Sequence, residues 1–520
     1  MKKLLSLLAL AIFIAACGSS NNGTSSNAKS KKKVANPTDY ANTITSEDLK
    51  TALYKYASDE FEGRETGKPG QKMAVNFLKD HYVKYGIPAA KKDGDYFQNV
   101  PLEVMSPPDI NVTVNGKAFK SIDHLVSVGS GESNTINAND IVYAGFGIED
   151  EKYSSYTNID VKGKIVVIKS GEPKNADGTY VISGNEDESK WSGFREQFAS
   201  KRDAAKERGA IAIMFHYPEV FAMAKMRFGT SSGRMSLAGK NDEMYYFMIN
   251  EDLAKSLVKD IDTNDESKVV KANIALDFKK KSEAITSENV AAYIKGSEKP
   301  DEVIVVSAHL DHEGVKDGEV YNGADDDGSG TVAILEMAEA FAKAVKDGNG
   351  PKRSILFLNV TGEEKGLLGS RHYTDNDPIF PLANTVANLN IDMIGRTDPK
   401  RKEGDRNYIY LIGSDKLSTD LHNVSEEVNT KYMNIELDYT FNDDNDPNRF
   451  YYRSDHYNFA KNNIPVIFYF NGTHDDYHQP SDTPDKIEYD LLENRTRLVF
   501  YTAWEVANRE NRIVVDKAVE

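Results

Sequence analysis

The sequence contains very little cysteine and no excess of positive charge. One cysteine, Cys17, occurs among 520 residues, so no disulfide can form within the chain. Lysine and arginine number 64 against 81 aspartate and glutamate residues, which gives a formal net charge of -17. Because nucleic-acid binding requires a basic face, we expect no nucleic-acid partner. A hydrophobic content of 39% is typical of a globular protein, and the length allows about two or three domains.

The apolar run near the N-terminus is too short to span a membrane. It extends from Leu4 to Ala16 after two lysines, whereas a membrane-spanning helix needs about 20 residues. Residues 1–16 are therefore predicted to be a signal peptide. The run ends in I-A-A-C-G, which resembles the lipobox of bacterial lipoproteins and implies lipidation of Cys17. We expect an exported lipoprotein, anchored to a membrane through Cys17 on the periplasmic or cell-surface side of a bacterial envelope.

Two segments follow the predicted signal peptide. Residues 17–45 are rich in Ser, Asn, Lys and Gly and predict a disordered tether that carries the lipid anchor. Residues 46–106 are predicted to be the first part of the main domain, because helical periodicity begins near Glu47. The clearest helix is expected from Gln71 to Tyr85, where apolar residues recur on one stripe.

Residues 107–288 differ in character from the segments on either side. Short β-prone runs dominate, at Ile141 to Phe146, Lys164 to Ile168 and Ile211 to Phe215, and one amphipathic helix is predicted from Gly193 to Arg208. This segment contains only His124 and His216 among the ten histidines. We interpret it as a β-rich inserted domain.

Residues 289–520 alternate between β-prone runs and helical runs such as Thr331 to Ala344. That alternation is typical of a doubly wound sheet. The predicted fold class is therefore α/β, with a doubly wound mixed sheet, helices on both faces and the β-rich insert interrupting the domain.

Potential metal ligands occur where β-prone runs of this last segment end in loops; they are His309, Asp326, Glu364, Asp392 and His478. Ligands in open α/β folds gather beyond the carboxyl ends of the strands, so these loops are expected to converge. Two imidazoles and three carboxylates suit a pair of divalent ions, zinc above all. Asp326 is the middle of three consecutive aspartates and is predicted to bridge both ions.

Two neighbouring residues, Glu363 and Asp311, have predicted roles around these ligands. Glu363 precedes Glu364, and adjacent residues leaving a strand point in different directions. One of the pair can therefore bind metal while the other, Glu363, acts as general base toward an activated water. Asp311 lies two residues after His309 and is predicted to orient that imidazole. Each residue alone is typical of an ordinary polar loop, and their order along the chain favours a site.

The ordered motifs S-A-H-L-D-H, G-A-D-D-D-G, T-G-E-E-K, N-I-D-M and Y-H-Q-P resemble those of the co-catalytic dizinc exopeptidases. That family includes leucyl-type and vacuolar aminopeptidases and glutamate carboxypeptidase. The resemblance implies two Zn²⁺ per chain and a cis peptide after Asp326. It also implies that His309 and Asp392 hold opposite ions, with Glu364 on one of these sides and His478 completing the set.

Two further resemblances are looser. In R-F-Y-Y-R-S-D-H-Y, Tyr451 resembles a tyrosine that stabilises the oxyanion in relatives, although Tyr452 is adjacent. V-Y-A-G-F-G-I and V-K-G-K-I-V-V-I in the insert resemble the protease-associated (PA) domain, which lies over or beside the active site in some relatives. The histidines close to the motifs are predicted to lie beside the site or at the surface: His312, His372, His456 and His474.

The functional expectation is a lipid-anchored dizinc aminopeptidase that acts on peptide substrates. A carboxypeptidase or dipeptidase on the same site is the first alternative, because Arg396 and Arg453 lie next to site motifs and can bind a substrate carboxylate. A non-enzymatic surface binding protein with structural metals is the second. Structural zinc sites prefer closed, cysteine-rich shells, which disfavours that alternative.

Overall fold

The computed structural model describes residues 35–129, 131–230, 233–239 and 244–517. The predicted signal peptide, Cys17 and most of the predicted tether lie outside these residues, so the lipid anchor stays a prediction. Across the described residues, no helix combines the length and the apolar character needed to cross a bilayer.

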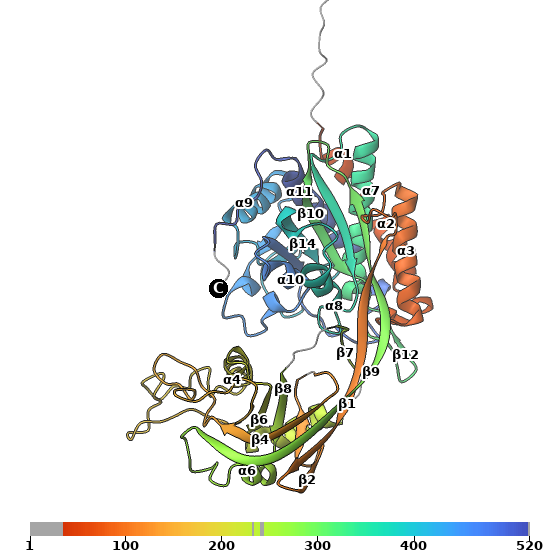
Figure 1. Cartoon of the computed structure of the whole chain (residues 1–520). Helices are drawn as coiled ribbons and strands as arrows, with labels where there is room; N and C mark the ends of the chain where they lie inside the picture. The colour runs from red at the N-terminus through yellow and green to blue at the C-terminus, as the bar shows by residue number, and fades with distance from the viewer. Residues whose placement is uncertain (1–34, 130, 231–232, 240–243, 518–520) are drawn as a thin grey trace, which may run out of the picture. The chain divides into compact units, whose positions relative to one another are not determined.

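The helices surround two sheet regions (Figure 1). The α-helices are α1 (Thr38–Ala41), α2 (Ser46–Tyr56), α3 (Pro69–Tyr85), α4 (Glu196–Glu207), α5 (Pro218–Ala224), α6 (Glu251–Leu257), α7 (Gly330–Lys346), α8 (Leu368–Arg371), α9 (Thr419–Val428), α10 (His456–Ala460) and α11 (Tyr489–Asn508). Single 3₁₀ or π turns that matter below are η1 (Asp59–Arg64), η3 (Ala324–Ser329) and η8 (Phe450–Tyr452).

The strands fall into a main set, an insert set and two long strands that run through both. The long strands are β1 (Phe97–Val114) and β9 (Lys268–Ile294). The insert has β2 (Lys117–Lys120), β3 (Leu125–Ser127), β4 (Asn134–Tyr143), β5 (Ile165–Lys169), β6 (Ala212–His216), β7 (Arg234–Leu237) and β8 (Tyr245–Ile249). The main set has β10 (Lys299–His309), β11 (Gly314–Lys316), β12 (Glu319–Tyr321), β13 (Arg353–Val360), β14 (Thr385–Ile391), β15 (Tyr408–Ile412), β16 (Glu436–Asp438) and β17 (Val466–Phe470).

The main sheet has the strand order β16-β15-β17-β14-β10-β13-β9. Its centre is parallel, since β10 pairs in parallel with β13 and β14, and β14 with β17. Antiparallel pairs flank this centre, β15 with β17 and β13 with β9. The sheet is therefore mixed, and the carboxyl ends of β10, β13, β14 and β17 lie along one edge, where ligands are expected.

Helices cover both faces of this sheet, as the fold-class prediction required. Alternating side chains of a strand point to opposite faces. Leu356 and Leu358 of β13 join a buried cluster with Phe459 of α10. Phe357 faces the other way and contacts Phe341 of α7, which in turn contacts Phe500 of α11. The doubly wound α/β prediction is confirmed.

The insert has its own core on both sides of β5. Ile165 and Val167 belong to one buried cluster, and Val166 and Ile168 belong to another. The predicted boundaries of this segment, 106/107 and 288/289, fall inside β1 and β9. These two strands are paired in antiparallel register over almost the whole of β1, with one irregularity between Ser106 and Asp109. The segment is therefore continuous with the main sheet through two strands.

Local signals place the helix ends close to the predicted ones. The α3 helix begins at Pro69 and ends before Gly86, whose φ of 76° is the left-handed conformation that glycine adopts without strain. The Thr45 side chain caps α2 by accepting a hydrogen bond from the Asp48 amide. The helices predicted at residues 71–85, 193–208 and 331–344 are confirmed to within a few residues as α3, α4 and α7.

One buried carboxyl group, that of Glu336 on α7, makes the stability of the folded protein depend on pH. Glu336 is 5% exposed, and burial together with the charges of Asp48 and Glu339 raises its pKa from 4.5 to about 8. A raised carboxyl pKa contributes stability that is present below about pH 4.5 and is lost as the pH rises through 8.

Glu336→Gln should therefore stabilise the protein at about pH 8 by roughly 1–3 kcal/mol and give little gain at about pH 5. Urea unfolding at both pH values measures the difference. The exposed Glu427→Gln on α9 serves as the control and should change neither midpoint. Equal stability of wild type and Glu336→Gln at the higher pH would contradict the assignment.

Candidate metal centre

The predicted ligands meet at the carboxyl edge of the main sheet. His309 is the last residue of β10, and Asp392 directly follows β14. Glu364 follows β13, and His478 lies in the loop after β17. Asp326 lies in η3, between the β11–β12 hairpin and α7, and the peptide bond from Asp326 to Asp327 is cis, as the resemblance implied.

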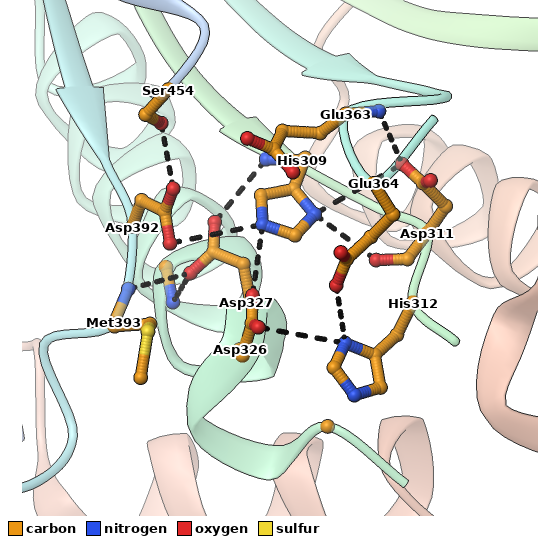
Figure 2. A network of polar contacts seen from close by, with 12 residues as sticks. His309, Asp311, His312, Asp326, Asp327, Glu363, Glu364, Asp392, Met393 and Ser454 are labelled. Atoms are coloured by element: carbon orange, nitrogen blue, oxygen red, sulfur yellow. Dashed lines mark hydrogen bonds and ion pairs between the residues drawn. The ribbon is translucent and has the colours of Figure 1, made fainter. Parts of the chain in front are cut away.

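One group of potential ligands consists of His309, Asp326 and Asp392. His309 Nε2 lies 3.1 Å from Asp326 Oδ1 and 3.7 Å from Asp392 Oδ1. All three residues are buried. This arrangement corrects the expectation that His309 and Asp392 hold opposite ions, because their side-chain tips lie close enough to contact a single ion. Figure 2 shows both side chains directed at the same point.

A second group forms around the other oxygen of Asp326. His478 Nε2 lies 3.0 Å from Asp326 Oδ2 and 3.2 Å from Glu364 Oε2. His312 adds a further nitrogen, with Nδ1 2.8 Å from Glu364 Oε1. Asp326 thus directs one oxygen at each group, which is the geometry of a carboxylate shared by two cations. In the structure Glu364 lies beside His478. Either His478 or His312 can provide the imidazole ligand of this second group.

The donors fit divalent cations because several have no other partner. Buried atoms without a hydrogen bond include His309 Nε2, Asp326 Oδ2, Glu364 Oε1 and both ring nitrogens of His312. An unpaired buried polar atom is costly, and a bound cation removes that cost. Imidazole nitrogen with carboxylate oxygen is a donor set that zinc accepts. The residues present therefore fit a pair of zinc ions held by His309, Asp326 and Asp392 on one side and by Asp326, Glu364 and a histidine on the other.

The electrostatics of the protein alone already favour ionised carboxylates here. Burial and the neighbouring Asp326 would raise the pKa of Glu364, but the adjacent imidazoles of His312 and His478 lower it to about 2. Burial also opposes ionisation of Asp326, and the adjacent imidazoles of His309 and His478 hold its pKa well below the ordinary value. Both carboxylates are thus available as anionic ligands.

Surrounding groups fix the orientation of the ligands (Figure 2). His309 Nδ1 is 3.0 Å from the backbone carbonyl of Asp311, whereas the Asp311 carboxylate is 3.9 Å away. Asp311 therefore holds the imidazole through its main chain, and its carboxylate instead accepts the Glu363 amide hydrogen at 3.1 Å. The Ser454 hydroxyl donates to Asp392 Oδ2 at 2.6 Å, which orients that ligand.

Glu363 lines a narrow pocket together with Asp326 and Asp392. Burial raises its pKa well above the ordinary value; the charges of Glu364 and Asp392 act in the same direction, and His309 opposes them. Within the described chain, no ion pair holds the Glu363 carboxylate. It is therefore a carboxylate beside the metal ligands that is free to exchange a proton.

The tyrosine in this pocket is Tyr477, and the expected Tyr451 lies elsewhere. Tyr477 lines the pocket of Glu363, and its pKa is raised by burial and by the charges of the site carboxylates. Tyr451 lines a separate cavity of about 720 Å³, with Tyr452 and Lys416. The reason is local: η8 turns Phe450 and not Tyr451 toward the metal centre.

The two arginines near the motifs differ in availability. Arg396 is paired with Asp476 at 2.7 Å, so its charge is already compensated. Arg453 lines the pocket with Glu363, packs its guanidinium over the Phe450 ring at 4.9 Å and is exposed. Among the described residues, no carboxylate forms an ion pair with Arg453, so it is the cation available to a ligand.

Three residues at the site have no specific role predicted from the sequence: Tyr477, His312 and Ser454. Tyr477 directly precedes His478, so the Y-H-Q-P motif that marks the ligand also contained the tyrosine. His312 is fully buried and lies beside Glu364. It is the second histidine of the H-L-D-H motif, so that motif contained a second potential metal ligand. Ser454 belongs to the S-D-H motif, whose spacing alone does not indicate that its hydroxyl contacts Asp392. The other predicted neighbours, His372, His456 and His474, are buried and outside both ligand groups.

Comparisons with known proteins match the part of the chain that carries these residues. Residues 289–503 match the model of peptidase family M28. Over 149 residues the chain is 33% identical to aminopeptidase YwaD of Bacillus subtilis (strain 168), covering 26% of this chain and 30% of that protein. Over 105 residues it is 34% identical to the probable glutamate carboxypeptidase LAMP1 of Arabidopsis thaliana, covering 20% of this chain and 14% of that protein.

Solved structures also resemble this chain. BSAP, a zinc aminopeptidase from Bacillus subtilis, aligns with a TM-score of 0.45 and 18% identity, covering 90% of this chain and 97% of that one. The sequence matches are shorter, and the chain spans less than a third of the length of YwaD and of LAMP1.

The shared position of Asp326 predicts an unequal effect of two isosteric substitutions. Asp326→Asn should abolish stoichiometric binding of both zinc ions, because the amide replaces the oxygen of one ligand group and removes the negative charge that both groups share. Asp392→Asn should cost only one ion. Metal analysis after gel filtration measures the content of each variant. His422→Ala, outside both groups, is the control and should keep the wild-type content, and a full metal complement in Asp326→Asn would refute the sharing.

Proposed function

We propose that this chain is a zinc-dependent exopeptidase, and specifically an aminopeptidase that releases N-terminal residues from peptides, because residues 289–503 match the model of peptidase family M28. The observation that carries the proposal is the pair of ligand groups sharing Asp326, with the Glu363 carboxylate unattached in the same pocket. A purely structural metal site requires only its ligands, and an additional carboxylate that binds no cation is not needed there.

Two bound zinc ions would supply Lewis acidity at the scissile carbonyl and at a water molecule. Glu363 accepts the proton of that water and transfers it to the leaving amine, a role that its raised pKa suits. Asp311 holds the Glu363 backbone through the amide hydrogen bond, so the base stays at the pocket. Tyr477 lines the same pocket, and we assign its hydroxyl as the donor to the carbonyl oxygen, on which negative charge develops.

The pocket also supports the choice of an N-terminal substrate. Its carboxylates, Asp326, Glu363 and Asp392, offer oxygen atoms that can accept hydrogen bonds from a free α-ammonium group. Aromatic and apolar side chains complete the wall: Met393, Phe450, Phe468 and Phe470. An apolar first side chain gains free energy by leaving water against such a wall. We therefore propose peptides with an apolar N-terminal residue as the substrate class.

A carboxypeptidase or dipeptidase is the second candidate, and one observation favours it. Arg453 brings an exposed guanidinium without an ion-pair partner in the described chain to the rim of this pocket. A guanidinium binds a carboxylate in a two-pronged geometry. On this alternative, Arg453 receives the C-terminal carboxylate of the substrate.

Hydrolysis of matched peptides separates the candidates. With zinc-loaded protein, an aminopeptidase cleaves a free peptide such as Leu-Ala-Ala and leaves its N-acetylated form intact. A carboxypeptidase cleaves the acetylated form and fails when the C-terminus is amidated. If metal-loaded protein cleaves neither these peptides nor a dipeptide such as Leu-Ala, both proposals fail and a binding protein is favoured.

Glu363→Gln should keep both metal ions and lower kcat by about 10²–10⁴-fold, because the isosteric amide cannot accept a proton. Metal analysis and steady-state kinetics of the same preparation test both parts. Glu427→Gln, an exposed glutamate on α9 outside the potential ligand groups, is the control. A near-normal kcat in Glu363→Gln would assign the base elsewhere.

Tyr477→Phe should lower kcat by about 10²-fold, as expected for loss of one donor to the developing oxyanion. Tyr451→Phe removes the same hydroxyl from the separate cavity and should leave kcat close to the wild-type value. Parallel kinetics on one peptide substrate compare the two variants. The reverse order of effects would restore the role predicted for Tyr451 from the sequence.

A further inference from the structure

The motif F-E-G-R-E-T-G, at residues 61–67, lies far from every potential ligand in the sequence, yet its residues contact the metal-binding loops. It begins in η1 and precedes α3. Arg64 and Thr66 are both completely buried. Apart from the Tyr56 carbonyl, which also accepts from Arg64, their side-chain hydrogen-bond partners lie about 250 residues later, in the loops that carry His309 and Asp326. The motif has no part in the chemistry described above, so its burial at this place calls for another role.

The Arg64 guanidinium joins the two loops. Its Nε donates to the Leu310 carbonyl at 3.2 Å, next to the ligand His309. Nη1 and Nη2 donate to the carbonyls of Asn322 and Gly323 at 2.8 and 2.9 Å, in the turn that leads to the ligand Asp326. The guanidinium also lies over a tyrosine ring of α2 at 4.6 Å.

Arg64 makes these contacts without a compensating carboxylate. Among the residues that the structure describes, no ion pair involves Arg64, and backbone carbonyls accept its hydrogen bonds. A fully buried cation is costly unless its hydrogen bonds are satisfied. The planar fork of donors suits several carbonyls at fixed angles, which the point charge of lysine does not. The Arg64 guanidinium therefore acts as a clamp, because it holds the backbones of the two loops together through their carbonyl groups.

Thr66 extends the contact to a third loop. Its hydroxyl donates to Asp311 Oδ2 at 2.7 Å, and Asp311 Oδ1 accepts the amide hydrogen of Glu363 at 3.1 Å. The Asp311 backbone carbonyl is the group that holds His309 Nδ1. Thr66 therefore fixes the residue that orients both a metal ligand and the general base.

The backbone of the motif packs against the same region. Glu65 pairs with His312 in an isolated β-bridge, and the His312 amide donates to the Arg64 carbonyl at 3.3 Å. Gly63 has a φ of 60°, and a Cβ there would lie 2.5 Å from the carbonyl oxygens of Gly314 and Tyr321. The hairpin β11–β12 thus approaches the motif too closely for any side chain at residue 63.

We infer that residues 63–66 are a positioning element for the metal centre, in which Arg64 sets the separation of the His309 and Asp326 loops and Thr66 sets the orientation of Asp311. The inference rests on the proposed zinc function, and it assigns no contact between these residues and substrate. It predicts that zinc affinity depends on a segment that supplies none of the ligands.

Arg64→Lys tests the clamp, with Arg353→Lys as the matched control. Arg353 is also completely buried and donates to the backbone carbonyls of Val506, Arg509 and Glu510, at the opposite end of β13 from the metal centre. Isothermal titration with zinc and melting temperatures of the metal-free proteins are measured for both variants. Arg64→Lys should bind zinc about 10–100-fold more weakly than wild type. Arg353→Lys should lose thermal stability and keep wild-type zinc affinity.

Thr66→Val provides a second variant that keeps the shape of the side chain and removes its hydroxyl. It should weaken zinc binding, and Thr66→Ser should restore the affinity because the donor returns. Wild-type zinc affinity in both folded Arg64→Lys and Thr66→Val would overturn the positioning role. A wild-type protein that binds no zinc would instead refute the proposed function, so the two failures are distinguishable.

Discussion

Negative charge concentrated where β10, β13 and β14 end is the constraint on which the rest of the catalytic part depends. Asp326, Glu364 and Asp392 lie within contact distance of shared imidazole nitrogens in a buried region. Carboxylates in such an environment require cations or hydrogen-bond donors. The protein supplies some donors itself, through Ser454 and the backbone, and leaves specific atoms unsatisfied. Those atoms define where a cation binds, and they couple the stability of the folded chain to metal concentration.

The same constraint explains why Glu363 and Glu364 differ although they are neighbours. Glu364 faces two imidazoles, which lower its pKa to about 2 against the effect of burial. Glu363 faces a buried pocket and other carboxylates, so burial and repulsion raise its pKa. Two chemically similar side chains thereby acquire different protonation behaviour from their surroundings alone. One becomes a ligand and the other a proton carrier.

Much of this arrangement could be predicted from the sequence because it follows strand ends. Apolar runs marked β10, β13 and β17, and polar residues directly after such runs had to converge at one edge of a parallel sheet. His309, Glu364 and Asp392 were found in this way. What could not be predicted is side-chain direction inside irregular turns. The η8 turn places Phe450, and not Tyr451, at the pocket. The loop after β17 places Tyr477 there, and no periodicity in the sequence specifies that position. The pairing of His309 with Asp392 likewise depends on loop conformation.

The continuity of β1 and β9 has a consequence for protein engineering. A domain inserted in a loop can be cut out at the loop ends, but here the two strands are hydrogen-bonded partners across the segment boundaries. Ser106 lies opposite Lys281, and Asn289 lies opposite Gln98. Joining residue 106 to residue 289 would therefore connect positions that are out of step along the ribbon. A shortened chain keeps its strand pairing only if the new junction joins facing residues, such as Leu102 and Ile285, through a tight hairpin turn.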